Sequence, residues 1–552
     1  MRRPSRTSPI LGRRTLLLIA GGWAMLWLVW SLWLGDVLAG AAAAPGADWL
    51  GRRIAARQAA DPNWLDPDHV AWVGRTVLTR LGLCWAALCL AIAVWPRRGR
   101  LFGGLVARLQ EADDPRNLAV LRIATFTTLL VVPAGREEFL VHLGLPEALR
   151  FPPGGLGPLV AALAPDPELG RTVLLAWIAV VAMAAAGFLT RFSTIAAALL
   201  SILVLGVPQL HGKVNHAHHL VWFAMLLAAS PCGDAWSFDS WIRRGRTGRG
   251  VPHRDRRYGV PLRFAWLLLG MVYLFPGIWK LWTGGIDWIV SDHLRNQIWL
   301  QWTTHGDWRP AIDPTRWPWL IRLGALGTIV FELSFIVLVL DRRTRPIAMV
   351  VGLLFHNATW FTIRIGFVSL QVCYLCLLDW AAIADRIRPR PLPRTNPPPA
   401  GSPAAAVAIG VLLIVINGVY GLRGQHLAWP FACYPKFAYP VRLPERTVIE
   451  VVAIRPDGSE RIESLATGRG ELRTARWIGV VTTVLREPDL ERRDAALAAL
   501  ADLAFDVPPG TTLRFDRVRR SVRPEDATAP PIDRTTLCTL VTPAGERPGP
   551  AE

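Results

Sequence analysis

The chain has 552 residues, of which 52% are hydrophobic and 19% are charged, and its formal net charge is +19. A soluble protein of this length carries more charge, so the composition excludes that class and favours a membrane protein with several spanning helices. Nucleic-acid binding, the usual explanation for so basic a chain, is disfavoured because the arginines cluster beside apolar runs, where they act as topology signals.

Eleven apolar runs are candidates for membrane-spanning helices. They cover approximately residues 15–34, 77–95, 117–133, 172–188, 193–210, 216–231, 262–280, 318–340, 346–362, 366–382 and 403–422. The first run is long for the apolar core of a signal peptide, so we expect an uncleaved helix, although AAAAP at 41–45 keeps cleavage open. We therefore predict an all-α polytopic membrane helix bundle of about 11 spanning helices, followed by a small C-terminal α+β extramembrane domain.

The same pattern divides the chain into four regions. We expect a two-helix N-terminal addition at 1–100, a transmembrane domain at 101–388, a Pro-rich linker with the last membrane helix at 389–422, and an extramembrane domain at 423–552. In the last region, 447–454, 511–518 and 535–541 alternate as strands do, whereas 471–485 and 490–503 are typical of helices. Asp457-Gly458 indicates a hairpin turn.

Arginine-rich loops orient the bundle. With the N-terminus inside, the loops near 97–100, 191, 243–257, 342–345 and 386–390 all fall on the inner side and are basic. This is the distribution that the positive-inside rule expects. We therefore predict a multi-pass protein of the cell membrane with a cytoplasmic N-terminus and an extracytoplasmic C-terminal domain. Cys433 and Cys538, the two cysteines of that domain, could then form a disulfide.

Polar side chains gather at the outer ends of several helices. The stretch 211–240 carries His211, His216, His218 and His219 before an apolar run. The predicted topology brings Lys280 and His356, from two later helices, to a similar depth as His216. Ionisable groups inside a membrane are costly to bury and therefore indicate function. A lysine amine in a dry pocket can also act as a general base.

Each of these residues also has an ordinary structural interpretation. A lysine at a helix end commonly extends to the interface, and a single His or Glu facing other helices commonly makes an interhelical hydrogen bond. A metal site is an alternative because His216 and His219 share a helical face, but no Cys or carboxylate follows at ligand spacing. The tryptophan-rich loop 281–317 is either an aromatic belt or a lid over a lipid-soluble ligand.

The transmembrane region resembles the vitamin K-dependent γ-carboxylase family, whose bacterial relatives share the horizontally transferred transmembrane (HTTM) domain. The resemblance covers about residues 117–380. It rests on three segments in the family's order and spacing: VNHAHHLVWFAMLLAASPCGDAWSFD, GIWKLWTGGIDW and FELSFIVLVLDRRTRPIAMVVGLLFHNATWF.

The resemblance implies roles for individual residues. The lysine proposed as the base for reduced vitamin K in that family matches Lys280, and two functional histidines match His216 and His356. We expect these three to be catalytic. Around them, the residues expected to bind substrate are Asn215, His219, Trp288, Glu332 and Asn357. The implied cofactor is a reduced, vitamin K-like quinone, and no metal is expected.

The implied reaction begins when the lysine deprotonates the hydroquinone. O2 then adds and the ring becomes an epoxide, while a basic alkoxide removes a glutamyl γ-proton before CO2 adds. Here Trp279 precedes Lys280 where the carboxylase has a lysine pair, and the tail is shorter than the carboxylase's lumenal region. The lipid bilayer, a quinone and a protein substrate are the expected partners. The alternative is a non-catalytic membrane receptor or assembly protein whose C-terminal domain binds a partner.

Overall fold

The structure is a computed structural model that describes residues 21–23, 25, 67–131, 137–214, 217–248, 252–305, 308–388, 402–432, 437–463 and 474–542. Most of the expected first helix and of the Pro-rich linker lies outside these residues, as do Asn215, His216 and Cys433.

Most of the described chain is helical. The helices before the C-terminal domain are α4 (Pro67–Val94), α5 (Arg98–Leu109), α6 (Pro115–Val131), α7 (Glu137–Leu143), α8 (Gly157–Leu163), α9 (Pro167–Ala186), α10 (Thr190–Val204), α11 (His218–Ala228), α12 (Phe238–Thr247), α13 (Arg256–Gly284), α14 (Asp287–Val290), α15 (His293–Thr304), α16 (Pro318–Leu338), α17 (Arg345–Ile363), α18 (Val368–Cys373), α19 (Trp380–Ile387) and α20 (Ala404–Leu422).

Seven helices of the described chain are long and apolar enough to cross a membrane. They lie in α4, α9, α10 with the turn after it, α13, α16, α17 and α20. A pair of helices around residues 368–387, bent by 66°, would make an eighth span. The expected run 216–231 is instead the 11-residue α11. At about 1.5 Å per residue, α11 is too short for a hydrocarbon core about 30 Å thick, so neither a span there nor the expected count of about 11 spans is confirmed.

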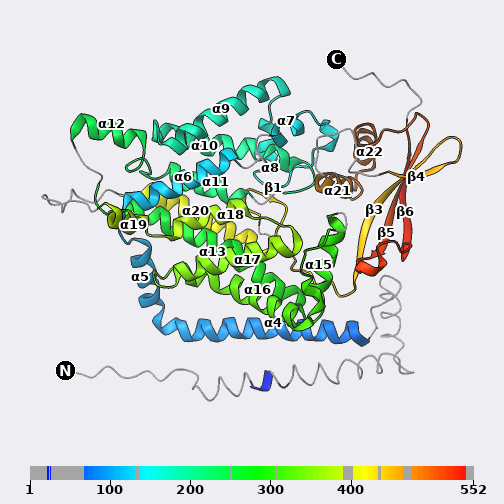
Figure 1. Cartoon of the computed structure of the whole chain (residues 1–552), viewed down its shortest axis with the longest axis horizontal. Helices are drawn as coiled ribbons and strands as arrows, with labels where there is room; N and C mark the ends of the chain where they lie inside the picture. Colours follow the sequence, from blue (N-terminus) through cyan, green and yellow to red (C-terminus); the bar gives the residue numbers. More distant parts are fainter. Residues whose placement is uncertain are drawn as a thin grey trace.

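The arginine-rich loops and the C-terminal domain lie at opposite ends of the helix bundle (Figure 1). Helices α5, α12 and α19 mark one end, at the left of the view, which we call the arginine end. Helices α7 and α15 and the C-terminal sheet mark the other, which we call the tail end. The helices that flank the arginine loops and the C-terminal sheet are therefore separated by the length of the bundle.

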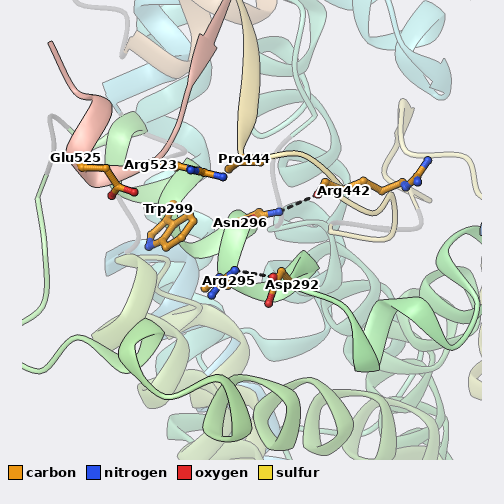
Figure 2. A pocket seen from close by; sticks show the side chains of 8 residues that line it. All are labelled: Asp292, Arg295, Asn296, Trp299, Arg442, Pro444, Arg523 and Glu525. Carbon is orange, nitrogen blue, oxygen red and sulfur yellow. Dashed lines mark hydrogen bonds and ion pairs between the residues drawn. The ribbon is translucent and has the colours of Figure 1, made fainter. Parts of the chain in front are cut away.

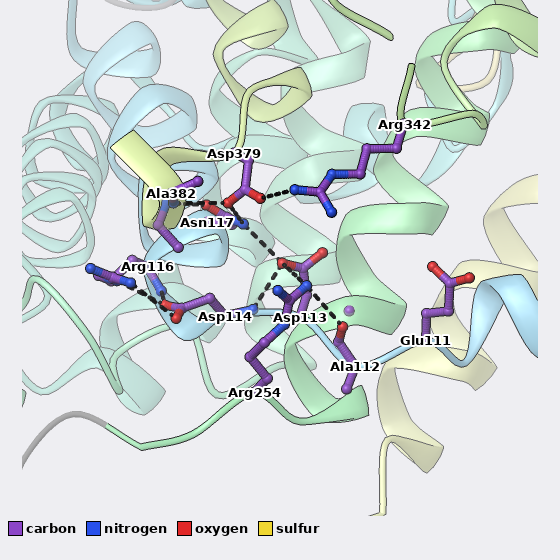
Figure 3. Close-up of polar contacts among 12 residues, drawn as sticks. Glu111, Ala112, Asp113, Asp114, Arg116, Asn117, Arg254, Arg342, Asp379 and Ala382 are labelled. Carbon is purple, nitrogen blue, oxygen red and sulfur yellow. Dashed lines mark hydrogen bonds and ion pairs between the residues drawn. The ribbon is translucent and has the colours of Figure 1, made fainter. Parts of the chain in front are cut away.

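Buried ion pairs tie the helices together at the arginine end (Figure 3). Asp113, ahead of α6, accepts hydrogen bonds from Asn117 (2.8 Å) and from Arg263 of α13 (2.9 Å). Arg116 reaches Asp385 of α19 at 2.7 Å. Such groups are stable inside a protein only when paired, so this network fixes the start of α6 and α13 relative to α19.

The C-terminal domain is a four-stranded antiparallel sheet with two helices. Its strands β3 (Glu445–Ile454), β4 (Glu460–Glu463), β5 (Thr512–Ser521) and β6 (Asp533–Val541) take the order β4-β3-β5-β6. Helices α21 (Thr474–Val484) and α22 (Leu490–Ala504) pack on one face in a shared apolar core. The elements predicted from alternation and turn signals are therefore confirmed. Cys538 on β6 is a free thiol, while its expected partner Cys433 lies outside the described residues.

Several contacts fasten the tail to the bundle. The short strands β1 (Gly154–Gly155) and β2 (Ala428–Trp429) pair in parallel. The indole of Trp222 in α11 donates to the Pro430 carbonyl at 2.9 Å. From α21, Arg476 forms an ion pair with Glu138 of α7 at 3.0 Å. Because these contacts come from separate helices, the start of the tail is part of the same packed structure as the bundle.

Candidate functional site

A cavity of about 600 Å³ lies between the helices toward the tail end. Its walls come from α11, α13, α16 and α17, with further residues from α14, α15, α18 and the tail residue Phe437. Ligand sites are commonly apolar cavities of this size that contain a few converging polar groups. Of the residues predicted from the sequence, five line this cavity: His219, Lys280, Trp288, Glu332 and His356.

Lys280 and Glu332 form a buried ion pair in the cavity wall. The Lys280 Nζ lies 2.6 Å from one carboxylate oxygen of Glu332 and 2.7 Å from the other. Both residues are almost fully buried. The sequence suggested that Lys280 would be surrounded by apolar groups and that Glu332 would contact substrate, so this direct pairing is a feature that sequence reasoning missed.

Close packing of two helices explains the pair. One turn before Lys280, Gly277 of α13 faces α16, and a Cβ atom there would lie 3.0 Å from Glu332 Cβ and from Leu333 Cδ2. A larger residue at this position would press against α16. Lysine and glutamate can therefore meet because glycine occupies the contact between their helices, which is common where membrane helices pack closely.

Trp288 covers the amine on a second side. Its ring centroid lies 5.5 Å from Lys280 Nζ, a distance at which a cation is attracted to an aromatic face. Its indole nitrogen donates to the Phe437 carbonyl at 2.7 Å, so the tail holds the ring in place. The ring of His293, on α15, lies 5.0 Å from the ring of Trp288, on α14.

His293 connects the site to the tail. Its Nδ1 accepts a hydrogen bond from the Val441 backbone N–H at 2.7 Å. Burial, followed by the charge of nearby Lys280, lowers the pKa of His293 to about 4. The imidazole is therefore neutral at physiological pH. Neither His293 nor its tail contact was predicted, because nothing in the sequence distinguishes it from the other polar residues of loop 281–317.

His356 belongs to a second polar group in the cavity. Its Nε2 is hydrogen-bonded to the Tyr273 hydroxyl at 2.6 Å and lies 3.1 Å from the hydroxyl of Tyr374. The two tyrosine hydroxyls also contact each other. Tyr273 and Lys280 are seven residues apart, or two helical turns, and therefore share a face of α13. That spacing is the signal by which the sequence could have revealed Tyr273.

The remaining predicted residues lie elsewhere. Asn357 does not line the cavity: it is exposed, and its amide donates to the Leu353 carbonyl at 2.7 Å and to Gln371 at 3.1 Å. A helix turns by about 100° per residue, so the neighbour of a cavity-facing His356 points elsewhere. Asn215 and His216 are outside the described residues. In their place, His218 and His219 of α11 line the cavity.

The tryptophan-rich loop both covers the site and contacts its surroundings. Trp288 and Trp302 are buried, and the Trp302 indole donates to the Thr362 carbonyl at 2.8 Å. Trp317 and Trp319 are exposed at the tail end of α16, as residues of an aromatic belt would be. Trp288 therefore lines the cavity, whereas Trp317 and Trp319 are exposed.

A second pocket, of about 430 Å³, lies between α15 and the C-terminal domain. It is polar, and Figure 2 shows Arg295, Arg442 and Arg523 around it together with Asp292 and Glu525. Arg295 is already paired with Asp292 at 2.5 Å. Among the described residues, no group of three His, Cys, Asp or Glu side chains is placed to hold a metal ion.

Long apolar helices around a buried ion pair define a polytopic membrane protein with a candidate site inside its helical bundle. Within this class, residues 111–380 match the HTTM domain. The matched segment contains both polar groups of the cavity and ends before α20 and the C-terminal domain. Comparison with curated proteins finds no match, and comparison with solved structures finds none either.

Proposed function

We propose that this protein binds a lipid-soluble hydroquinone in the cavity and removes a proton from its ring hydroxyl. The observation that carries the proposal is the Lys280–Glu332 pair, 2.6 Å apart and buried among apolar residues. Burying two charges carries a desolvation penalty. This pair also lines a cavity between membrane helices, where ionisable groups commonly mark a functional site.

The choice of lysine supports proton transfer. The chain has only three lysines, Lys213, Lys280 and Lys436, although its lysines and arginines total 61. Arginine keeps its proton under all ordinary conditions, whereas a buried lysine can lose its proton. A chain that uses arginine for nearly every other positive charge thus has one of its three lysines in the wall of this cavity.

In the proposed step, the pair acts as a unit. The hydroquinone O–H bond breaks, its electron pair stays on the oxygen, and the proton passes through Lys280 to the Glu332 carboxylate. The resulting phenolate lies beside the Lys280 ammonium group, which stabilises it. The pair gains one positive charge and the ligand one negative charge, so the cavity remains neutral overall. Tyr273 and His356 offer hydrogen bonds for the second ring oxygen.

The family resemblance extends the proposal to oxidation. There, O2 would react with the phenolate, one oxygen atom would enter the ring as an epoxide, and the other would leave as water. Carboxylation of a glutamyl side chain is the further step that the resemblance implies. The polar pocket under the C-terminal domain, with its three arginines, is the surface we propose for a protein partner that carries carboxylates.

The arginine distribution supports an orientation as well. We propose that the arginine end is cytoplasmic, because positive residues are retained on that side, and that the C-terminal domain lies outside the cell membrane.

A matched pair of ligands tests the proposed binding mode. A naphthohydroquinone and its dimethyl ether have the same ring, but only the first has protons to donate. In nanodiscs, we expect the hydroquinone to bind at least about tenfold more tightly, a difference of about 1.4 kcal/mol, and Lys280→Ala to remove this preference. Equal affinity of the unaltered protein for both ligands would contradict the proposal.

A further inference from the structure

The cavity changes from buried to exposed along its length. At its inner part, Lys280, Tyr273 and His356 are at most 4% exposed. At the other part, α16 contributes Leu320, Gly324 and Gly327, which are exposed although they line the cavity. On the facing helix α17, the same is true of Val351, Leu354 and Ala358. The cavity therefore has a mouth between α16 and α17.

This mouth lies within the membrane-spanning part of the chain. Pro318–Leu338 and Arg345–Ile363 are both candidate spans. Neighbouring residues outside the mouth are large, apolar and exposed, such as Leu323 (56%), Val330 (57%) and Val350 (51%). Apolar side chains exposed along a spanning helix contact lipid tails. The mouth thus opens toward the bilayer interior.

The end of the cavity nearest the C-terminal domain is covered. Helix α15 lies over it through Leu294 and Ile298, and Phe437 of the tail closes it from the same side. Asn296, on another face of α15, donates to the Val441 and Arg442 carbonyls at 3.0 and 3.1 Å. These hydrogen bonds attach α15 to the tail. A ligand entering from water would have to displace them, whereas a ligand entering from the bilayer through the mouth would not.

Glycine keeps the mouth open. A Cβ atom at Gly327 would meet nothing within 4 Å, and one at Gly324 would meet only Leu294 at 3.7 Å. Each turn of α16 here presents a residue without a side chain toward the gap. A bulky substitution at Gly327 would therefore enter open space at the mouth rather than the packed core of the bundle.

We propose that the ligand is a lipid with a polar ring and a long apolar tail, and that its tail leaves the cavity between α16 and α17 into the bilayer. This deepens the proposed function and rests on it for the position of the ring beside Lys280. A cavity of about 600 Å³ matches the volume of a drug-sized molecule, so a longer polyprenyl or alkyl tail has to continue outside it.

The test compares two ligands and three glycine variants in nanodiscs. The ligands are a naphthohydroquinone with a polyprenyl tail and the same ring with only a methyl group. Gly327→Phe fills the mouth and Gly327→Ala adds only a methyl group. Gly418→Phe is the matched control, since Gly418 also lies in a spanning helix with space around it, its nearest neighbour being Met271 at 3.9 Å.

We expect Gly327→Phe to weaken binding of the tailed ligand at least about tenfold and to change binding of the short ligand less than about twofold. Gly327→Ala and Gly418→Phe should bind both ligands as the unaltered protein does. Equal effects of Gly327→Phe on both ligands, or no effect on either, would overturn the proposed tail route.

Lys280→Ala separates this inference from the proposed function. Binding that depends on Lys280 but shows no tail-dependent effect of Gly327→Phe overturns the tail route and leaves the proposed function standing. A tail-dependent effect of Gly327→Phe without dependence on Lys280 supports the route and overturns the proposed position of the ring. If neither ligand binds, both the tail route and the proposed function are overturned.

Discussion

The Lys280 amine lies between both oxygens of the Glu332 carboxylate, at 2.6 and 2.7 Å, with the Trp288 ring 5.5 Å away. An isolated lysine at this depth would be a simple base. A lysine held by a carboxylate is part of a proton-sharing pair, in which the carboxylate accepts the proton and the ammonium group stabilises the product anion. The proposed function and two of the predictions below follow from this relationship.

The first prediction concerns loss of the amine. Lys280→Ala should slow O2-dependent oxidation of a bound hydroquinone about a hundredfold or more, the usual scale for loss of a general base. Lys280→Arg should not restore the rate, because guanidinium keeps its proton. Oxidation measured by absorbance in nanodiscs checks both variants.

Lys213→Ala is the matched control, because Lys213 does not line the cavity and its backbone carbonyl, which accepts from Arg476, is retained. Equal rates for Lys280→Ala and Lys213→Ala would show that the amine at 280 has no part in the reaction.

The second prediction concerns stability. Glu332→Gln leaves a buried ammonium group without its carboxylate, and removing one partner of a buried pair typically costs about 3–5 kcal/mol. The double variant Lys280→Met/Glu332→Gln should recover much of this loss, because no buried charge then remains. Thermal unfolding in one detergent would measure the coupling. Additive effects of the two substitutions would show that the pair is not coupled.

The sequence was sufficient to predict the main helices and part of the candidate site. Apolar runs and arginine loops located α13, α16 and α17 because these helices are long and regular. Their predicted directions placed Lys280 and His356 at one depth. Both line one cavity, but His356 contacts Tyr273, which lies two helical turns before Lys280 on α13.

The directions in which side chains point from their helices were harder to predict. Whether Glu332 meets substrate or Lys280 depends on how closely α13 and α16 approach, which Gly277 determines through tertiary packing. Asn357 was assigned to the site because it follows His356, although adjacent helical residues point in different directions. The short α11 was expected to span the membrane because its apolar run continues into turns at its end, and hydropathy alone does not distinguish helix from turn.

The third prediction concerns pH and the attachment of the tail. Burial and Arg476 lower the pKa of His142 to about 4, and burial together with His142 lowers that of His211 to about 2. Burial likewise lowers the pKa of His293 to about 4. In the unfolded chain these imidazoles have pKa values near 6.5. Below pH 6.5 the unfolded chain therefore binds more protons than the folded chain. The free energy of unfolding is at its full value above this pH and falls as the pH drops toward about 4.

Thermal unfolding of the full chain between pH 7.5 and pH 5 measures the effect. The loss can approach about 1.4 kcal/mol per pH unit for each histidine. His293→Gln should make the pH dependence shallower, whereas His253→Gln, at an exposed position of the arginine end, should not. A pH dependence unchanged by His293→Gln would show that this histidine does not contribute.

The fourth prediction concerns orientation. A cysteine introduced at Gly458, in the exposed hairpin turn of the C-terminal domain, should react with a membrane-impermeant maleimide in intact cells. A cysteine at Gly245 of α12, at the arginine end, should react only after lysis, because the arginine loops are expected inside. A variant lacking the exposed native Cys84 and the two tail cysteines, Cys433 and Cys538, provides the background. The reverse pattern would invert the orientation.

The most direct test of the account is whether the Lys280–Glu332 pair deprotonates a bound hydroquinone. The absorbance spectrum of the ligand, recorded without O2 in nanodiscs at neutral pH, distinguishes hydroquinone from its anion. We predict the anion spectrum with the unaltered protein and with Lys213→Ala, and the neutral spectrum with Lys280→Ala and Glu332→Gln. A neutral spectrum for a ligand fully bound to the unaltered protein would contradict the proposed role of the pair.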